Sequence, residues 1–163
     1  MDFEFTEEQK LLRESIVKLL ERECPPEKAR QWDQNGYFPV ELYRQMAQMG
    51  FMGIPFPEQY GGSGLGATEL LILQEQLAKR LLPVQMTYQV SIVVSGLTLL
   101  SLATEEQKKQ YLPGLAKGDI TFCIAFTEPN AGSDAASITT SAVLDGDAYR
   151  LNGQKLFITA ASL

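Results

Sequence analysis

The chain has 163 residues, of which 45% are hydrophobic and 21% charged, a profile typical of a globular protein of one or two domains. Its formal charge of -6 and pI near 4.7 argue against the basic surface that nucleic-acid-binding proteins usually carry, so we expect no nucleic-acid partner. The chain contains no histidine, which excludes Ser-His-Asp and Cys-His nucleophiles, zinc sites with histidine ligands and an imidazole base within it.

The N-terminus and the two cysteines indicate the compartment. Met1-Asp2-Phe3-Glu4 is acidic and lacks the basic and apolar regions of a signal peptide, so we expect a cytoplasmic protein, with a processed product as the alternative. Cys24 and Cys123 have neither the spacing of metal ligands nor the density of a disulfide scaffold. We therefore expect two buried thiols in a reducing compartment, and no metal site.

The first fifty residues predict two helices. Thr6-Glu7-Glu8-Gln9 has the pattern of a capping box, and an apolar stripe at helical spacing follows it at Leu12, Ile16, Leu19 and Leu20. Pro25-Pro26 should end this helix, and a short polar stretch should continue to Asn35-Gly36. Pro39 should then open a second amphipathic helix, which Gly50 closes.

Residues 50–66 contain six glycines and two prolines, which predict a long loop between helices. This loop could be a hinge, a wall of a binding site, or only a tightly folded connector. Leucines at helical spacing predict the next helix over residues 68–82, with Pro83 as its stop.

Residues 84–103 include no charged side chain, and their number would suffice to cross a bilayer. Eight of the twenty are Gln, Ser, Thr or Gly, however, so we expect a helix buried in a bundle or lining an apolar cavity, and no membrane span. Thr104-Glu105-Glu106-Gln107 repeats the capping-box pattern, and Pro113-Gly114 should end the helix that it begins.

The pattern changes near residue 119 from helical spacing to strands and turns, which predicts domains at 1–118 and 119–163. Asp145-Gly146-Asp147 and Asn152-Gly153 should be turns. Around them we expect four strands, at residues 120–126, 137–144, 148–151 and 155–159. The predicted fold class is α+β, with an N-terminal all-α bundle followed by the start of an antiparallel β domain.

The sequence Thr127-Glu128-Pro129-Asn130-Ala131-Gly132-Ser133-Asp134 resembles a loop that binds an anion such as a pyrophosphate. Pro129 blocks regular structure, and Gly132 lets the backbone approach a ligand with its N–H groups exposed. The hydroxyls of Thr127 and Ser133 add neutral donors. On local composition alone, a plain Gly-Ser-Asp turn is the alternative interpretation.

This loop and the later segment Leu151-Asn152-Gly153-Gln154-Lys155-Leu156-Phe157-Ile158-Thr159 resemble, at this separation, the paired signatures of the acyl-CoA dehydrogenase family. Two upstream segments, residues 52–64 and 104–113, resemble the helical half of that family in the same order. The resemblance covers residues 2–162, and because family chains continue well beyond this length, we expect an N-terminal fragment.

The resemblance implies FAD as the cofactor and assigns residues to it. Ser133 would contact the pyrophosphate and the CoA moiety of the substrate, Thr127 the pyrimidine end of the flavin, and Thr159 the flavin N5 edge. The full set of implied cofactor-binding residues is Ile124, Ala125, Phe126, Thr127, Glu128, Pro129, Asn130, Ala131, Gly132, Ser133, Phe157, Ile158 and Thr159.

The sequence departs from the family pattern at three places. Asn130 stands where glycine is frequent, Phe157 where tryptophan is common, and Ala160-Ala161 where Asn-Gly is usual. Phe157 removes an indole N–H, which makes the docking of an electron-transfer partner less certain than flavin binding. For Phe157 the alternative interpretation is an ordinary core aromatic of a strand.

The implied activity is the α,β-dehydrogenation of an acyl-CoA thioester in fatty acid metabolism, with hydride transfer to FAD and an electron-transfer flavoprotein as acceptor. The family's carboxylate base lies in its C-terminal domain, so we expect no catalytic residue in this chain, and we assign no catalytic role to Glu128. The longer parent would be a homodimer or homotetramer, and residues 88–100 favour an apolar acyl tail. The alternatives are a flavin oxidase or monooxygenase of the same fold, and a non-catalytic helical interaction module or degenerate fragment.

Overall fold

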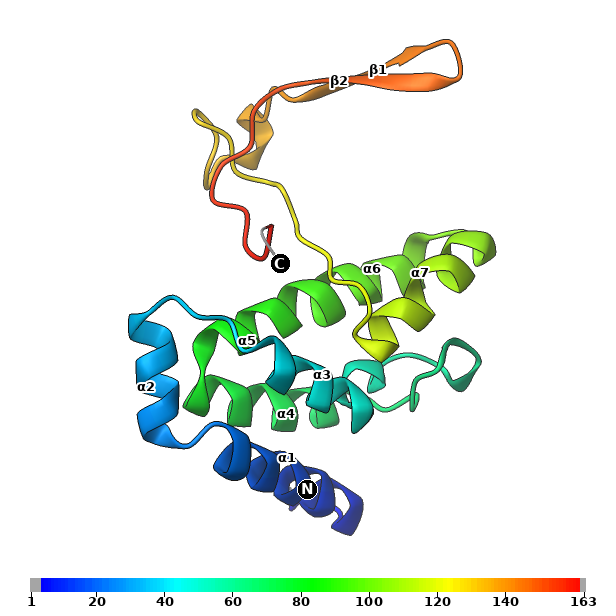
Figure 1. Cartoon of the computed structure of the whole chain (residues 1–163). Coiled ribbons are helices and arrows are strands. Elements are labelled where there is room, and N and C mark those ends of the chain that lie inside the picture. Colours follow the sequence, from blue (N-terminus) through cyan, green and yellow to red (C-terminus); the bar gives the residue numbers. More distant parts are fainter. Residues whose placement is uncertain (1–3, 162–163) are drawn as a thin grey trace. The chain divides into compact units, whose positions relative to one another are not determined.

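The computed structural model describes residues 4–161, which form two compact units that divide between Phe122 and Cys123 (Figure 1). The first unit is helical, and the second contains one β-hairpin, a short 3-10 turn and extended loops. Residues 1–3, which include the acidic start of the chain, lie outside the described residues.

Helix α1 (Glu7–Glu23) begins at the predicted capping box, which is confirmed. The Gln9 backbone N–H donates to Thr6 Oγ1 at 3.3 Å, and the Thr6 backbone N–H donates to Gln9 Oε1 at 3.0 Å. These two bonds satisfy N–H groups that a helix start otherwise leaves without a partner. Ile16, Leu19 and Leu20 are buried, so the predicted apolar stripe is the face that packs into the core.

Helix α2 (Pro26–Gln34) occupies the stretch for which the sequence predicted no helix, so that prediction was wrong. Pro26 ends α1 but also starts α2, because proline is pre-organised for the first position of a helix, where no N–H is needed. Helix α3 (Val40–Gln48) follows Pro39, as predicted. Gly50, two residues after its end, has a left-handed φ of 80° and turns the chain.

The segment between α3 and α4 is a tightly folded connector that contributes to the core. It contains two short 3-10 helices, Phe51–Gly53 and Glu58–Tyr60. Five of its large side chains are buried, namely Phe51, Met52, Ile54, Phe56 and Tyr60, whereas Leu65 is exposed. A Cβ atom at Gly62 would lie 2.0 Å from the Phe56 carbonyl oxygen, so only glycine fits there. The loop is therefore tightly folded, as the connector interpretation expected.

Helix α4 (Ala67–Arg80) leads into a continuous helix over Leu82–Leu102 that consists of α5 (Leu82–Tyr88), a π-helical segment (Gln89–Gly96) and α6 (Leu97–Leu102). Pro83 lies in the first turn of α5. The 21-residue helix is long and apolar enough to cross a membrane, by length and composition alone, and a core helix of a bundle meets the same criteria. Tyr88 and Ile92 on it are buried in the helical core.

Helix α7 (Glu105–Lys117) begins at the second capping box, which is also confirmed. Its predicted end at Pro113-Gly114 was wrong, because the helix continues to Gly118, which closes it with a left-handed φ of 69°. Leu112, Leu115 and Ala116 are buried on one face of α7, and this packing outweighs the local cost of proline.

The second unit contains β1 (Ser141–Asp145) and β2 (Ala148–Asn152), an antiparallel pair in which Asp145 lies opposite Ala148. The turn predicted at Asp145-Gly146-Asp147 is confirmed, with Gly146 at a φ of 69°. The strands predicted at 120–126 and 155–159 are absent, and Asn152-Gly153 does not form a hairpin turn. Alternation of apolar residues indicates a strand only where a ladder partner exists, and within residues 4–161 neither segment has a paired strand.

Candidate functional site

The predicted anion loop is closed by a tight turn. The Glu128 N–H donates to the Ala131 carbonyl at 2.9 Å, and the Ala131 N–H donates back to the Glu128 carbonyl at 3.2 Å. Pro129 and Asn130 are exposed at the tip of this turn, whereas Ala131 is buried. The reciprocal bonds fix the direction in which the chain enters Gly132 and Ser133.

The structure brings the anion loop together with the later predicted segment. The Leu156 N–H donates to the Thr127 carbonyl at 2.9 Å, and Lys155 Nζ donates to the Phe126 carbonyl at 3.1 Å. Residues 126–127 and 155–156 therefore lie side by side, although 27 or more residues separate them in the sequence. The two motifs that the sequence singled out form one site within the second unit.

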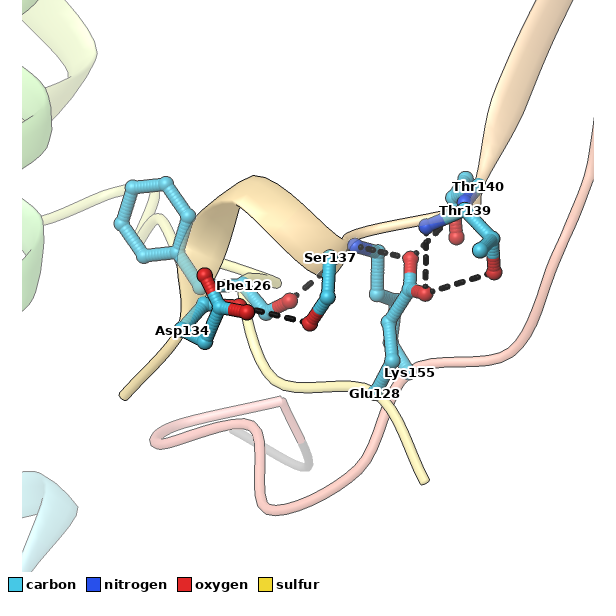
Figure 2. Close-up of polar contacts among 7 residues, drawn as sticks. All are labelled: Phe126, Glu128, Asp134, Ser137, Thr139, Thr140 and Lys155. Atoms are coloured by element: carbon cyan, nitrogen blue, oxygen red, sulfur yellow. Dashed lines mark hydrogen bonds and ion pairs between the residues drawn. The ribbon is translucent and has the colours of Figure 1, made fainter. Parts of the chain in front are cut away.

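Glu128, whose side chain is buried, is the centre of a cluster of polar groups (Figure 2). Its Oε2 accepts hydrogen bonds from the Thr139 N–H at 2.8 Å and the Thr139 hydroxyl at 3.0 Å. Its Oε1 accepts from the Thr140 N–H and from Lys155 Nζ, both at 2.9 Å. These donors, with Thr140 first, then Thr139 and Lys155, hold the pKa of Glu128 well below its usual range.

Several donors of the site are left uncommitted. Within residues 4–161, the hydroxyls of Thr127, Ser133 and Thr159 and the N–H groups of Gly132 and Ser133 have no hydrogen-bond partner. A Cβ atom at Gly132 would meet nothing within 4 Å, and its φ is not left-handed, so neither packing nor backbone conformation requires glycine there. Free neutral donors beside an unobstructed backbone suit an anionic group.

Two aromatic rings of the site are uncovered. Phe126 is 65% exposed and Phe157 is 89% exposed, and the backbone of Phe157 has a φ of 56°. Phe157 is therefore not the core aromatic of a strand that the alternative interpretation expected. The remaining predicted residues, Ile124, Ala125 and Ile158, are half-buried or exposed.

Cysteine and metal chemistry contribute nothing recognisable to this site. Cys24 is buried, as expected, but Cys123 is exposed, so the prediction of two buried thiols was wrong for Cys123. Cys123 precedes the loop in an extended segment that has no ladder partner to cover it. Among residues 4–161, no cluster of three His, Cys, Asp or Glu side chains could hold a metal ion.

The sequence did not reveal the side-chain cluster around Glu128. The acidic and basic partners, Glu128 and Lys155, are 27 residues apart, and Thr139 and Thr140 lie between them in a stretch without a motif. One signal for this cluster was present in the sequence. Glu128 stands next to the apolar run of the first motif and Lys155 next to that of the second, so each motif carries a charge opposite to the other.

Two family models match the chain over most of its length. Residues 6–119 match the model of the acyl-CoA dehydrogenase N-terminal domain, and residues 123–163 match that of the acyl-CoA dehydrogenase middle domain. The two matches correspond to the two units of the structure.

Individual relatives agree with these matches. The probable acyl-CoA dehydrogenase YngJ of Bacillus subtilis is 40% identical over 162 residues, which are 99% of this chain and 42% of that protein. A solved structure described as the electron transferring flavoprotein of Acidaminococcus fermentans is 34% identical, with a TM-score of 0.93 over 99% of this chain and 42% of that chain. An acyl-CoA dehydrogenase of Bacillus anthracis complexed with FAD is 31% identical, with a TM-score of 0.82 over 95% of this chain and 27% of that chain.

Proposed function

Because this chain belongs to the acyl-CoA dehydrogenase family, we propose that it is the N-terminal part of a flavin-dependent oxidoreductase that dehydrogenates an acyl-CoA thioester between its α and β carbons. The observation that carries this proposal is the set of uncommitted donors at residues 127, 132, 133 and 159 beside two exposed aromatic rings. The chain spans 42% of the length of its Bacillus subtilis relative, so the complete activity belongs to a longer protein.

The residues of the second unit fit FAD. The cofactor combines a pyrophosphate, which neutral N–H and hydroxyl donors can bind, with a flat ring system that aromatic side chains can cover. The Bacillus anthracis relative is complexed with FAD. When bound, FAD supplies a two-electron acceptor for the oxidation of the substrate.

The chain's own residues would hold and orient the reactants. We assign Ser133 and the Gly132 N–H to the pyrophosphate, with Ser133 also beside the CoA moiety of the substrate, and Thr127 and Thr159 to the polar edges of the flavin ring. Phe157 would cover one flank of the ring and exclude water from it. The base that removes the α-proton would come from the protein outside residues 4–161.

We further propose an electron-transfer flavoprotein as the electron acceptor, a homodimer or homotetramer as the assembly, and the cytoplasm and fatty acid metabolism as the setting. One relative in fold is described as an electron transferring flavoprotein, which supports a connection with this class of acceptor. The uncharged helix Leu82–Leu102 is compatible with an apolar acyl tail.

The test uses the full-length protein. We expect it to purify yellow, with a flavin spectrum that bleaches under anaerobic conditions when a saturated acyl-CoA is added. The 163-residue chain alone should bind FAD weakly or not at all. A colourless full-length protein that FAD does not reconstitute would contradict the proposal, and rapid reoxidation by oxygen would favour an oxidase instead.

A further inference from the structure

The carboxylate of Glu128 cannot act as a base or contact a cofactor directly, because both of its oxygens are already engaged. Its two carboxylate oxygens accept four hydrogen bonds, which is about the number of lone-pair sites that a carboxylate offers. Its N–H and carbonyl close the turn with Ala131. The side chain is 5% exposed. A carboxylate with all of its acceptor positions occupied must contribute through the groups that it holds in place.

The four bonds connect three parts of the site. Glu128 belongs to the anion loop, Lys155 precedes the segment that carries Phe157 and Thr159, and residues 139–140 lead into β1. Figure 2 shows the carboxylate of Glu128 between Lys155 and the two threonines. Lys155 also donates to the Phe126 carbonyl at 3.1 Å, so its ammonium group bonds the loop at two points. Removing this pair would leave the backbone bond from Leu156 to Thr127 as the direct connection between the two halves of the site.

The second unit offers little else to hold these parts in register. Between residues 123 and 161, Ala131 is the one apolar side chain that is buried. Enclosed, charge-assisted hydrogen bonds are roughly twice as strong as neutral ones, and removing one partner of an enclosed pair leaves the other charge without compensation. The ion pair of Arg150 with Asp145 differs, because both of its side chains are well exposed.

We propose that the ion pair of Glu128 and Lys155 is a positioning device that holds the anion loop against the Phe157–Thr159 segment, and so fixes the orientation of the flavin. This inference rests on the proposed function, and it assigns a task to two side chains that do not themselves touch the cofactor. The threonine donors of residues 139 and 140 complete the device by fixing the carboxylate.

The test measures FAD binding and the visible circular dichroism of the bound flavin in the full-length protein. Glu128→Gln and Lys155→Met should each raise the dissociation constant for FAD about tenfold or more, because each leaves an enclosed partner unpaired. At saturating FAD both variants should still show an altered visible dichroism, because the ring is oriented differently. Lys155→Arg, which keeps the charge and the donors, should recover most of the wild-type affinity.

Arg150→Met is the matched control, since it removes an exposed ion pair from the same unit and should leave FAD affinity and dichroism unchanged. The double variant Glu128→Gln/Lys155→Met should be scarcely worse than either single variant, because the two side chains act as one pair.

The outcomes separate the two proposals. If the wild-type protein binds FAD but Glu128→Gln and Lys155→Met match it in affinity and dichroism, the positioning role is wrong while the proposed function stands. Variants that lose thermal stability yet bind FAD with a wild-type spectrum would show a purely structural pair, which also overturns the inference. If Glu128→Gln does not fold, the two Lys155 variants decide the question. The positioning role is then overturned if Lys155→Met binds FAD as tightly as Lys155→Arg. A wild-type protein that binds no FAD overturns the proposed function and with it the device.

Discussion

In the helical unit the buried side chains are almost all apolar, whereas residues 123–161 contain two buried side chains, Ala131 and Glu128. The helices are placed by a shared hydrophobic core, in which even the connector between α3 and α4 takes part. The loops of the second unit are placed by hydrogen bonds and one enclosed ion pair. The two units should therefore respond to different perturbations, the first to lost volume and the second to lost charge.

The largest expected effect is on the stability of the helical unit, which depends on its apolar core. Leu73 on α4 is fully buried, so Leu73→Ala should reduce the free energy of unfolding of the helical unit by about 2–5 kcal/mol. Leu71 on the same helix is 69% exposed, and Leu71→Ala should change it by less than about 0.5 kcal/mol. Urea unfolding of the 163-residue chain, followed by far-ultraviolet circular dichroism, measures both. Equal losses for the two variants would contradict the assigned core.

The second expected effect concerns pH. The pKa of Glu128 is lowered in the folded protein, so its stabilising effect is fully present above the unfolded value of about 4.3 and is lost as the pH falls from there through the folded pKa. Its charged partner is Lys155, whose Nζ lies 2.9 Å from Glu128 Oε1. We expect the amide NMR signals of Thr139 and Thr140 to shift only in strongly acid solution. In the Glu128→Gln variant these two amide signals should no longer shift in acid. If they shift as in the wild-type protein, the acid response belongs to another group.

A third prediction concerns single hydroxyl groups. Ser133→Ala in the full-length protein should weaken FAD or substrate binding by about 1 kcal/mol, or roughly fivefold, the scale of one hydrogen bond. Thr159→Val should chiefly slow reduction of the flavin by substrate. Fluorescence titration and stopped-flow absorbance measure the two effects. Ser141→Ala, on exposed β1, is the control, and wild-type behaviour of both site variants would refute the assigned roles.

The smallest expected effect lies on the hairpin. The Asp145 carboxylate accepts a hydrogen bond from Arg150 at 2.5 Å, but the two side chains are 59% and 77% exposed. Asp145→Asn should therefore change the stability of the chain by less than about 0.5 kcal/mol, and by less still in high salt. A larger loss in urea unfolding would mean that exposed charges also contribute to holding the second unit.

The features that the sequence predicted correctly depend on neighbouring residues. Thr6 with Gln9 and Thr104 with Gln107 form capping boxes within one turn, and Gly146 sets a turn by its own φ. Helix α2 was missed for a local reason, since Pro26 starts a helix as readily as it ends one. Elsewhere distant packing decided the outcome. Pro113 stays inside α7 because the buried face of that helix extends beyond it.

In the candidate site, too, the features set by neighbouring residues could be predicted and those set by distant contacts could not. Thr127, Ser133 and Phe157 could be proposed because they belong to contiguous motifs. The bonds from Lys155, Thr139 and Thr140 to Glu128 could not, because they span 11 to 27 residues and depend on how the loop folds back. The strands expected at 120–126 and 155–159 failed for a related reason, since a ladder needs a partner that local alternation does not specify.

The π-helical segment Gln89–Gly96 changes which sequence positions of the long helix Leu82–Leu102 face the core. A π turn takes one residue more than an α turn, so after it the positions that face the core are shifted along the sequence relative to a regular α-helix. Leu97, Leu99 and Leu100 of α6 pack against the same core as Tyr88 and Ile92, whereas Leu102 is 82% exposed. Deleting one residue inside the segment should give a regular α-helix that keeps the same faces against the core, so here, unlike in a regular helix, a shorter chain would be the more regular one.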